Sequence, residues 1–339
     1  SRSLDKSFVK LQLLRNTFAA NIPGRKDDGI EAAKGDYLTP FQSELFALVN
    51  SYKDLCFQER THENGEEIRF VYVLHALNHV LKTRTKILNN NARVSKKTTS
   101  ASDEIRDQGL VRPKVLIVVP FRDSCKRIID MVIKLWFPED KGQVQNRNRF
   151  EEDFGSEEMP RRNKPDDYYN TFAGNIDDSF KIGLAVTKKA LKLYSDFYSS
   201  DIIIATPLGL RTVIGVEGER ERDYDFLASI ELLIMDQMDV YTMQNWDHIT
   251  HLMEHMHMQP AKSHGVDFTR VRMWTLDKLS HLYRQTLMFG AVAFPEMNAV
   301  FRKSCHNYMG RIRLENAVIT GSACQVVSTV PMDFYRFEA

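Results

Sequence analysis

Two acids just after a short apolar run are the residues of this chain best suited to chemistry. The run 232–235 ends on Asp236, and Asp239 follows after Gln237. A run of this kind is typical of a buried parallel strand, whose carboxyl end would present Asp236 where α/β proteins bind ligands. In nucleotide-driven motors such an acid holds Mg²⁺, and a following Glu activates water. Gln237 cannot accept a proton in that way, so the pattern predicts a nucleotide site without its base.

A phosphate-binding loop is the second part that such a site requires. The pattern G-x-x-x-x-G-K-[ST] supplies bare backbone amides and a lysine for the phosphates, but Gly-Lys-Ser/Thr occurs nowhere in the chain. The best candidate is the loop 59–67, which has one glycine, Gly65, among the acids Glu63, Glu66 and Glu67. Carboxylates there would repel phosphate. We therefore expect that this loop does not bind phosphate.

Metal sites have two weaker candidates. Asp236 and Asp239 could bind Mg²⁺ alone, but carboxylates usually need substrate phosphates to complete its shell. We interpret them as a strand-end cap and a helix start. Residues 251–255 match the zinc pattern H-x-x-E-H, and His248 shares their helical face. Since nothing points to an acidic third ligand, we interpret the histidines as residues of a partly exposed helix. We expect no metal, no cofactor and no catalytic residue.

Composition limits the class of protein. The 339 residues are 43% hydrophobic and 27% charged, enough for a core in one large domain or two. The net charge of +1 gives no overall basic field, so any nucleic-acid surface must be a local patch. The four cysteines are far apart, which suits a reducing compartment. No apolar run approaches the roughly 18 residues of a membrane span, so no membrane partner is expected.

Periodicity predicts the elements that would position Asp236. Strands alternate with helical stretches, which favours a mainly parallel sheet with helices on both faces. The expected helices are 8–18, one beginning at Thr39-Pro40, 68–88 and 122–137. The expected strands are 54–58, 114–119, 181–186, 201–205, 232–235, 286–289 and 317–320.

Five segments, in order, resemble the motifs of DEAD-box helicases. Thr39-Pro40-Phe41-Gln42 resembles the adenine-reading Q motif, and Asp236–Asp239 stands where D-E-A-D belongs. Residues 120–123 resemble P-T-R-E, 205–211 resemble T-P-G-R, and 289–291 stand where S-A-T belongs. The resemblance implies a RecA-like fold. The degenerate nucleotide site would comprise Gln42, Gly65, Asp236, Asp239 and Gly290.

Longer segments resemble one divergent, DEAD-box-like pseudo-helicase family, the digestive organ expansion factor family (U-three small nucleolar RNA-associated protein twenty-five). They are NSYKDL (50–55), LHALNHVLK (74–82), RPKVLIVVPFR (112–122), FYSSDIIIATPLGLRTVIG (197–215), MQNWDH (243–248), RVRMW (270–274) and RQTLMFGA (284–291).

The resemblance implies a nucleolar (nuclear) factor of the small-subunit processome. It would bind pre-rRNA and small nucleolar RNA (rRNA binding and snoRNA binding) beside processome proteins. It would act in rRNA processing that yields 18S rRNA, early in ribosome biogenesis. We expect no oligomer. Residues 1–36 would be an N-terminal extension and 37–339 the first lobe. Because the chain starts at Ser1, we expect a fragment, with a second lobe beyond Ala339. Its polar inserts, 89–112, 138–180 and 215–225, are expected to project from the sheet, as partner-binding segments or as solvated loops.

RNA contacts could survive without ATP. Arg122, Thr206 and Arg211 fall on slots that touch the RNA backbone in DEAD-box proteins, where contacts fix position but read no sequence. The added residues Leu208–Leu210 put the aim of Arg211 in doubt. Alternatively, Arg122 and Arg211 pair with neighbouring acids, and Gln42 is simply a polar residue early in a helix.

Three functions stay open. The leading one is a non-catalytic assembly factor that docks on pre-ribosomal RNA and processome proteins. The others are an ATP-dependent RNA helicase with a rebuilt nucleotide site and a protein-only scaffold.

Overall fold

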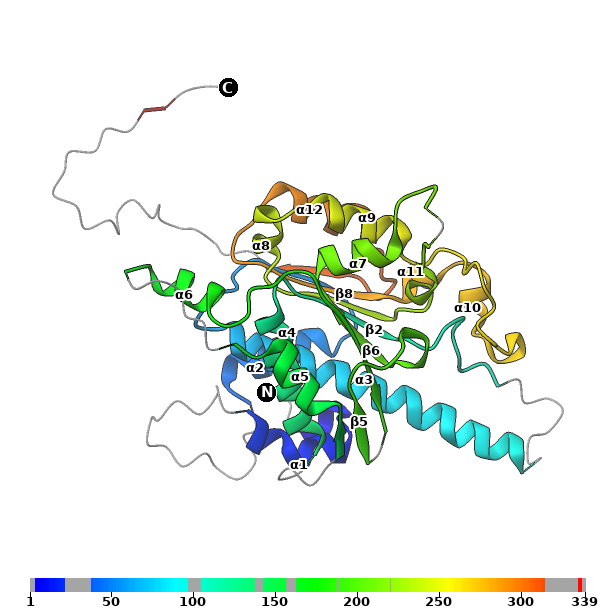
Figure 1. The fold of residues 1–339 in the computed structure, drawn as a ribbon. Coiled ribbons are helices and arrows are strands. Elements are labelled where there is room, and N and C mark those ends of the chain that lie inside the picture. Colours follow the sequence, from blue (N-terminus) through cyan, green and yellow to red (C-terminus); the bar gives the residue numbers. More distant parts are fainter. Residues whose placement is uncertain are drawn as a thin grey trace.

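One mixed sheet forms the centre of the molecule (Figure 1). The computed structural model describes residues 4–21, 38–96, 105–137, 143–156, 163–187, 189–219, 221–314 and 335–336. Within them the strand order is β3-β5-β4-β6-β2-β7-β8-β1-β9. The strands are β1 (Asp54–Phe57), β2 (Val115–Val118), β3 (Gln143–Gln145), β4 (Lys181–Val186), β5 (Ala190–Lys192), β6 (Ile202–Ala205), β7 (Leu232–Met235), β8 (Gln285–Phe289) and β9 (Arg311–Leu314).

The mainly parallel α/β sheet that the sequence predicts is confirmed. From β6 through β2, β7, β8 and β1 to β9 all neighbours are parallel, whereas β4 runs antiparallel to β6 and to β5. We did not predict β3, β5 or β9, because the first two are three residues long and β9 is an edge strand with polar and apolar residues alternating. The strand expected at 317–320 lies outside the described residues.

Two apolar layers fix the orientation of each strand. In β2, Val115 and Ile117 belong to one buried cluster while Leu116 and Val118 belong to the other, as the two-residue period of a strand requires. One face is covered by α1 (Leu11–Ala20), α2 (Pro40–Val49), α3 (Gly65–Ser95), α4 (Arg122–Trp136) and α5 (Arg147–Phe154). The other is covered by α7 (Pro207–Ile214), α8 (Met238–Met243), α9 (Asp247–His255) and α12 (Pro295–Ser304).

The ends of the sheet carry the remaining short helices. α6 (Asp166–Phe172) lies at the end where β7 leads into α8, and α10 (Met273–Leu276) lies at the opposite end with the last turns of α3 (Figure 1). α11 (Ser280–Tyr283) precedes β8. Single 3-10 turns occur at Leu4–Ser7, Phe197–Ser199, Asp225–Leu227 and Phe268–Arg270. No helix in the described ranges has both the length and the apolar character of a membrane span.

The first helix is not placed as the sequence suggested. α1 begins at Leu11, and Phe8, Leu11 and Phe18, which we expected on its apolar face, are exposed. Leu14, which we also expected on that face, is buried, and Leu13 is buried beside it. Asn16 donates a hydrogen bond of 2.9 Å to the carbonyl oxygen of Leu135 in α4 and so fixes which face packs.

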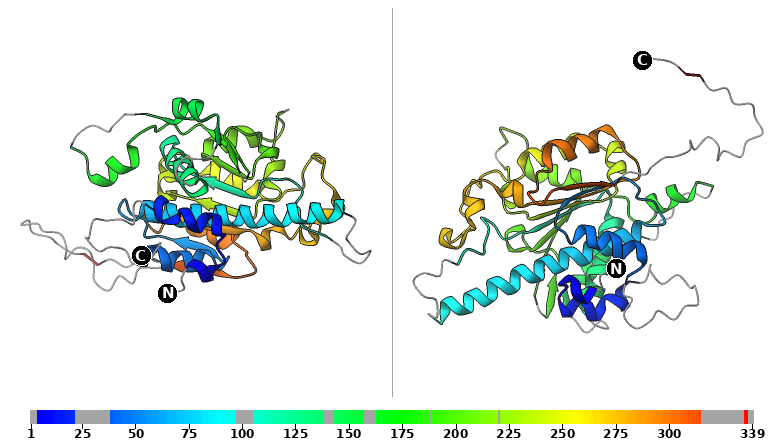
Figure 2. Two further views of the ribbon diagram at one scale, coloured as in Figure 1. Left: turned by 90° about the horizontal axis from the view of Figure 1, so that it is seen from below. Right: turned by 180° about the vertical axis from the view of Figure 1, so that it is seen from behind.

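Parts of the three expected inserts pack against the rest of the domain. Helix α3 continues past the predicted end at residue 88 to Ser95 and extends beyond the sheet (Figure 2). Its last turns are held by a hydrogen bond of 2.8 Å from Asn90 to Asp107. Within the insert 138–180, Phe150 and Phe154 of α5 are buried in the core. In the insert 215–225, Asp225 is buried. These anchors join positions far apart in the chain, which no local pattern reveals.

Candidate functional site

The carboxylate of Asp236, at the carboxyl end of β7, is fully buried and fully engaged. Its Oδ1 accepts hydrogen bonds from Arg60 Nε at 2.6 Å and from the Gln237 amide at 2.9 Å. Its Oδ2 accepts from the Tyr72 hydroxyl at 3.0 Å and lies 3.8 Å from Arg69 Nη2. Burial raises the pKa of Tyr72 and the Asp236 carboxylate raises it further, so the hydroxyl stays protonated and donates. Two guanidinium groups therefore supply the positive charge that a bound metal ion would supply at such a strand end.

The loop before α3 is closed around Arg60. The Arg60 amide donates to the Gly290 carbonyl at 3.0 Å, and Asn64 bridges the loop by accepting from the Thr61 amide at 2.7 Å. A Cβ atom on Gly65 would lie 2.9 Å from Arg60 Nη2, so the guanidinium rests directly on the first turn of the helix. A cation there opposes the helix dipole, and the Asp236 carboxylate offsets that cost. The place of a phosphate at this helix terminus is taken by a side chain.

Gln42 lies in the first turn of α2 with its amide already paired. Gln42 Nε2 donates to Asn21 Oδ1 at 2.9 Å, and Asn21 Nδ2 donates to Gln42 Oε1 at 2.7 Å. Gln42 also forms a capping box with Thr39. Gln42 and Asn21 are both buried, so the geometry favours a helix-capping glutamine over a reader of adenine. Asn21 supplies the hydrogen bonds that an adenine edge would use.

Two further hydrogen bonds hold the segment Asp236–Asp239 in place. Gln237 adopts a left-handed backbone (φ 58°), and its Oε1 accepts a hydrogen bond of 2.6 Å from the Ser124 hydroxyl. Asp239 Oδ1 accepts a hydrogen bond of 2.9 Å from the amide of Ala291, next to Gly290. The degenerate site residues Gly65, Asp236, Asp239 and Gly290 are thus brought together, and Gln42 is held from another side through Asn21. The site is closed by contacts within the chain.

Helix α6, from the insert 138–180, lies over this site. It lines a cavity of about 680 Å³ together with the Arg60 loop, the start of α4 and the start of α8. Phe172 of α6 packs on Phe121, with ring centroids 5.7 Å apart. The lining carboxylates are Glu66, Asp123, Asp166, Asp167 and Asp239, and the lining guanidinium groups are Arg60, Arg69 and Arg127. An excess of carboxylates disfavours a triphosphate.

Glu66 shows how tightly these charges are coupled. Burial alone would raise its pKa, but Arg69 and Arg127 outweigh burial and lower the pKa to about 2. Arg69 Nη1 and Arg127 Nη1 both contact Glu66 Oε1, the latter at 3.1 Å. Arg127 also holds Asp123 at 2.7 Å. These arginines are already committed to carboxylates of the chain.

The three residues expected to touch RNA are in different states. Arg122 donates to the Asp153 carbonyl at 2.7 Å, contacts Asp177 Oδ2 at 3.1 Å and lies 5.2 Å from the Phe154 ring centroid. Thr206 is buried, and its hydroxyl accepts from the Gly209 amide at 3.0 Å as the N-cap of α7.

Arg211, also in α7, is half-buried and makes no ion pair within the described part of the chain. Pairing with an acid therefore describes Arg122 but not Arg211.

Arg122 and α7 share a second cavity, of about 270 Å³. Its walls include Arg149 and Lys181 beside Arg122, with Gly209 and Thr212 from α7. We did not single out Arg149 or Lys181 from the sequence, because one lies in a polar stretch and the other opens a strand. Arg60 and Asn21 were missed for a similar reason: each reaches a distant partner, and no local pattern indicates it.

The fold and the site define an NTP hydrolase-like domain of RecA type. A parallel sheet carries an acid at the end of β7, behind a loop that opens the long helix α3. The family model described as "UTP25, NTP hydrolase-like domain" matches residues 52–312, and the chain belongs to this family. The predicted family resemblance is confirmed.

Curated relatives agree. The chain is 53% identical over 312 residues to "U3 small nucleolar RNA-associated protein 25 homolog" of Xenopus tropicalis, covering 90% of this chain and 41% of that protein. It is 52% identical to the homologue of Homo sapiens (89% and 41% covered). It is 41% identical to "U3 small nucleolar RNA-associated protein 25" of Pyricularia oryzae (88% and 41% covered). The chain thus spans about two fifths of the length of these relatives.

Among solved structures, "DEAD-box helicase Mss116 bound to ssRNA and UDP-BeF" aligns with a TM-score of 0.46 and 14% identity, covering 93% of this chain and 45% of that chain. A score of this size carries no argument about function.

Proposed function

We propose that this chain is a helicase-like, non-catalytic part of a ribosome biogenesis factor. It acts in the nucleolus, in the small-subunit processome, and docks on pre-rRNA, U3 small nucleolar RNA and neighbouring proteins during early processing of the small-subunit rRNA. The name of its relatives, U3 small nucleolar RNA-associated protein 25, supports the RNA association. The observation that carries the non-catalytic part is the Asp236 carboxylate, engaged by Arg60 and Arg69.

Binding of Mg²⁺ and ATP would require this network to break. Arg60 is 11% exposed and Asp236 is 0% exposed, so both charges would lose a buried partner. Breaking a buried pair costs about 3–5 kcal/mol. The chain has no Gly-Lys-Ser/Thr pattern whose backbone amides and lysine could offset that cost with phosphate contacts. A nucleotide would also meet the carboxylates of α6.

Nucleotide binding and turnover test this part. The full chain is titrated with fluorescent methylanthraniloyl-ATP and Mg²⁺, and phosphate release is measured with and without single-stranded RNA. We expect no saturable binding at millimolar nucleotide and no turnover. RNA-stimulated turnover that Asp236→Ala abolishes, but Asp166→Asn does not, would instead establish the helicase with a rebuilt site.

RNA contact is proposed at the cavity shared by Arg122 and α7. The cavity residues Arg149 and Lys181 supply cations there, and Arg211 lies in the same helix α7 as the lining residues Gly209 and Thr212. Thr206 is buried and caps that helix. Arg122 would exchange Asp177 for an RNA phosphate, which is feasible because Asp177 is 45% exposed.

Crosslinking to RNA in cells tests this contact, with the variants Arg122→Glu and Arg211→Glu. We expect both charge reversals to reduce crosslinking. Lys86→Glu, on the exposed face of α3, is the matched control and should leave it unchanged. If neither reversal alters crosslinking, the protein-only scaffold is the better description.

A further inference from the structure

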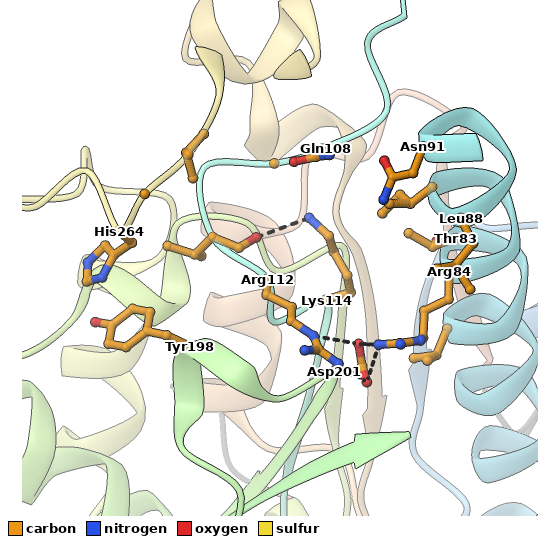
Figure 3. Close-up of a pocket in the computed structure, with 16 residues that line it drawn as sticks. Thr83, Arg84, Leu88, Asn91, Gln108, Arg112, Lys114, Tyr198, Asp201 and His264 are labelled. Carbon is orange, nitrogen blue, oxygen red and sulfur yellow. Dashed lines mark hydrogen bonds and ion pairs between the residues drawn. The ribbon is translucent and has the colours of Figure 1, made fainter. Parts of the chain in front are cut away.

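A separate cavity lies at the opposite end of the sheet from the degenerate site. It has a volume of about 390 Å³ and sits between the second half of α3 and the chain that leads into β2 (Figure 3). Lys114 and Asp201 immediately precede β2 and β6, so the cavity is at the amino ends of parallel strands. Nothing in the proposed nucleotide or RNA chemistry uses it.

Cations outnumber carboxylates in its lining. Arg84 Nη1 donates to both oxygens of Asp201, at 2.9 and 3.0 Å, and Arg112 donates through Nε and Nη2 at 3.1 and 3.0 Å. The two guanidinium groups approach the one carboxylate from two sides, with Lys114 beside them (Figure 3). One negative charge is thus shared by two positive ones. Arg84 Nη2 and Arg112 Nη1 make no hydrogen bond within the described part of the chain, so donors remain for a second anion.

Part of the remaining cavity wall is apolar. The side chains of α3 that face it include Val80, Ile87 and Leu88, and Val111 and Val266 lie across from them. Leu88 is 49% exposed. On the side of the cavity away from α3, Tyr198 and His264 stack with ring centroids 3.9 Å apart (Figure 3). Such a wall can bury an aliphatic or aromatic side chain next to the cationic centre.

We propose that this cavity docks a short acidic segment of a protein partner, with one Asp or Glu carboxylate on Arg84 and Arg112 and a neighbouring apolar side chain against α3. Charge complementarity selects the anion. The aliphatic side chains of Ile87 and Leu88 favour a peptide, which can place an apolar side chain next to its carboxylate. The inference rests on the proposed function only for the presence of protein partners. It deepens that function by naming their chemistry.

Selection from a random library of phage-displayed dodecapeptides tests the proposal on the full chain. We expect the selected peptides to combine Asp or Glu with Leu, Ile or Phe. Arg112→Gln should weaken a selected peptide roughly tenfold, the loss typical of one charge-assisted hydrogen bond. Leu88→Ala should weaken it too, without changing charge. Asp201 keeps Arg84 and the Val186 amide in Arg112→Gln, so this variant retains its fold.

Controls separate specific docking from general attraction. Lys86→Gln removes a cation from the exposed side of the same helix and should leave peptide affinity within twofold. Replacing the acid of a selected peptide by its amide should match the effect of Arg112→Gln. The proposal is overturned if no peptide is selected, if selected peptides lack acids, or if Arg112→Gln weakens binding of a twelve-nucleotide uridine RNA but not of the peptides. ATP and RNA measurements at the other end of the sheet are independent of Arg112, so the two proposals fail separately.

Discussion

Replacing Asp236 by alanine should destabilise the fold strongly, whether or not any nucleotide is present. The substitution removes the carboxylate that accepts from Arg60 and from the Tyr72 hydroxyl, whereas Arg69 keeps its contact with Glu66. Because Asp236 is fully buried and the Arg60 side chain is only 11% exposed, the relevant cost is that of stranding a largely buried charge, about 3–5 kcal/mol, and not that of a surface pair. At roughly 2 °C per kcal/mol for a domain of this size, the melting temperature should fall by about 6–10 °C.

Asp239→Ala is the matched control. It removes a carboxylate from the same segment, but Asp239 is half-buried and accepts one described hydrogen bond, from the Ala291 amide. Its cost should be about 1 kcal/mol. Circular dichroism of the full chain, in urea and on heating, measures both.

A double-mutant cycle tests the cause. Arg60→Ala should lose much of its own effect in the Asp236→Ala background, since the two side chains act as one unit. Equal losses of unfolding free energy for Asp236→Ala and Asp239→Ala would contradict this reasoning, and so would additive effects of Asp236→Ala and Arg60→Ala. Either result would show that Asp236 and Arg60 do not act as a buried ion pair.

Three further outcomes follow from the same geometry. The folded-state pKa of Glu66 is lowered from 4.5 to about 2, so its contribution to stability is complete above pH 4.5 and is lost as pH falls toward 2. Glu66→Gln should therefore remove part of the dependence of the urea unfolding midpoint on pH between these values. An unchanged dependence would contradict the lowered pKa of Glu66. Gln42→Ala breaks the buried amide pair with Asn21 and should cost about 1–3 kcal/mol. Calorimetry with added ATP should show no further change, whereas ATP stabilisation of the parent chain alone would favour adenine reading. Thr206→Ala removes the N-cap of α7 and should cost about 1–2 kcal/mol, while RNA affinity measured by anisotropy below the melting range stays the same; Thr206→Ser should restore stability.

Local patterns predicted a large part of this molecule. The apolar run 232–235, its ending on Asp236 and the alternation of strands with helices were readable, because burial on both faces of a parallel strand leaves a continuous apolar signal. The absence of a Gly-Lys-Ser/Thr pattern could also be seen, since it concerns residue types alone. Family membership followed from segments that keep their order along the chain.

The short strands and the packed inserts were not readable. β3 and β5 are too short for a periodic signal, and their pairing is decided by partners elsewhere in the sheet. The burial of Phe150 and Phe154 makes part of an apparently polar insert a layer of the core. Composition averages over such anchors and hides them.

The sequence by itself determined that Asp236 follows a buried strand, that Gln237 comes next, and that no Gly-Lys-Ser/Thr occurs in the chain. Only the tertiary structure decided what that acid does. Arg60, 176 positions away in the chain, donates a hydrogen bond to Asp236, and Asn21 forms hydrogen bonds with the side-chain amide of Gln42. Long polar side chains choose partners by proximity in space and by the cost of leaving a buried charge alone. Neither proximity nor burial is written in the local order of residues.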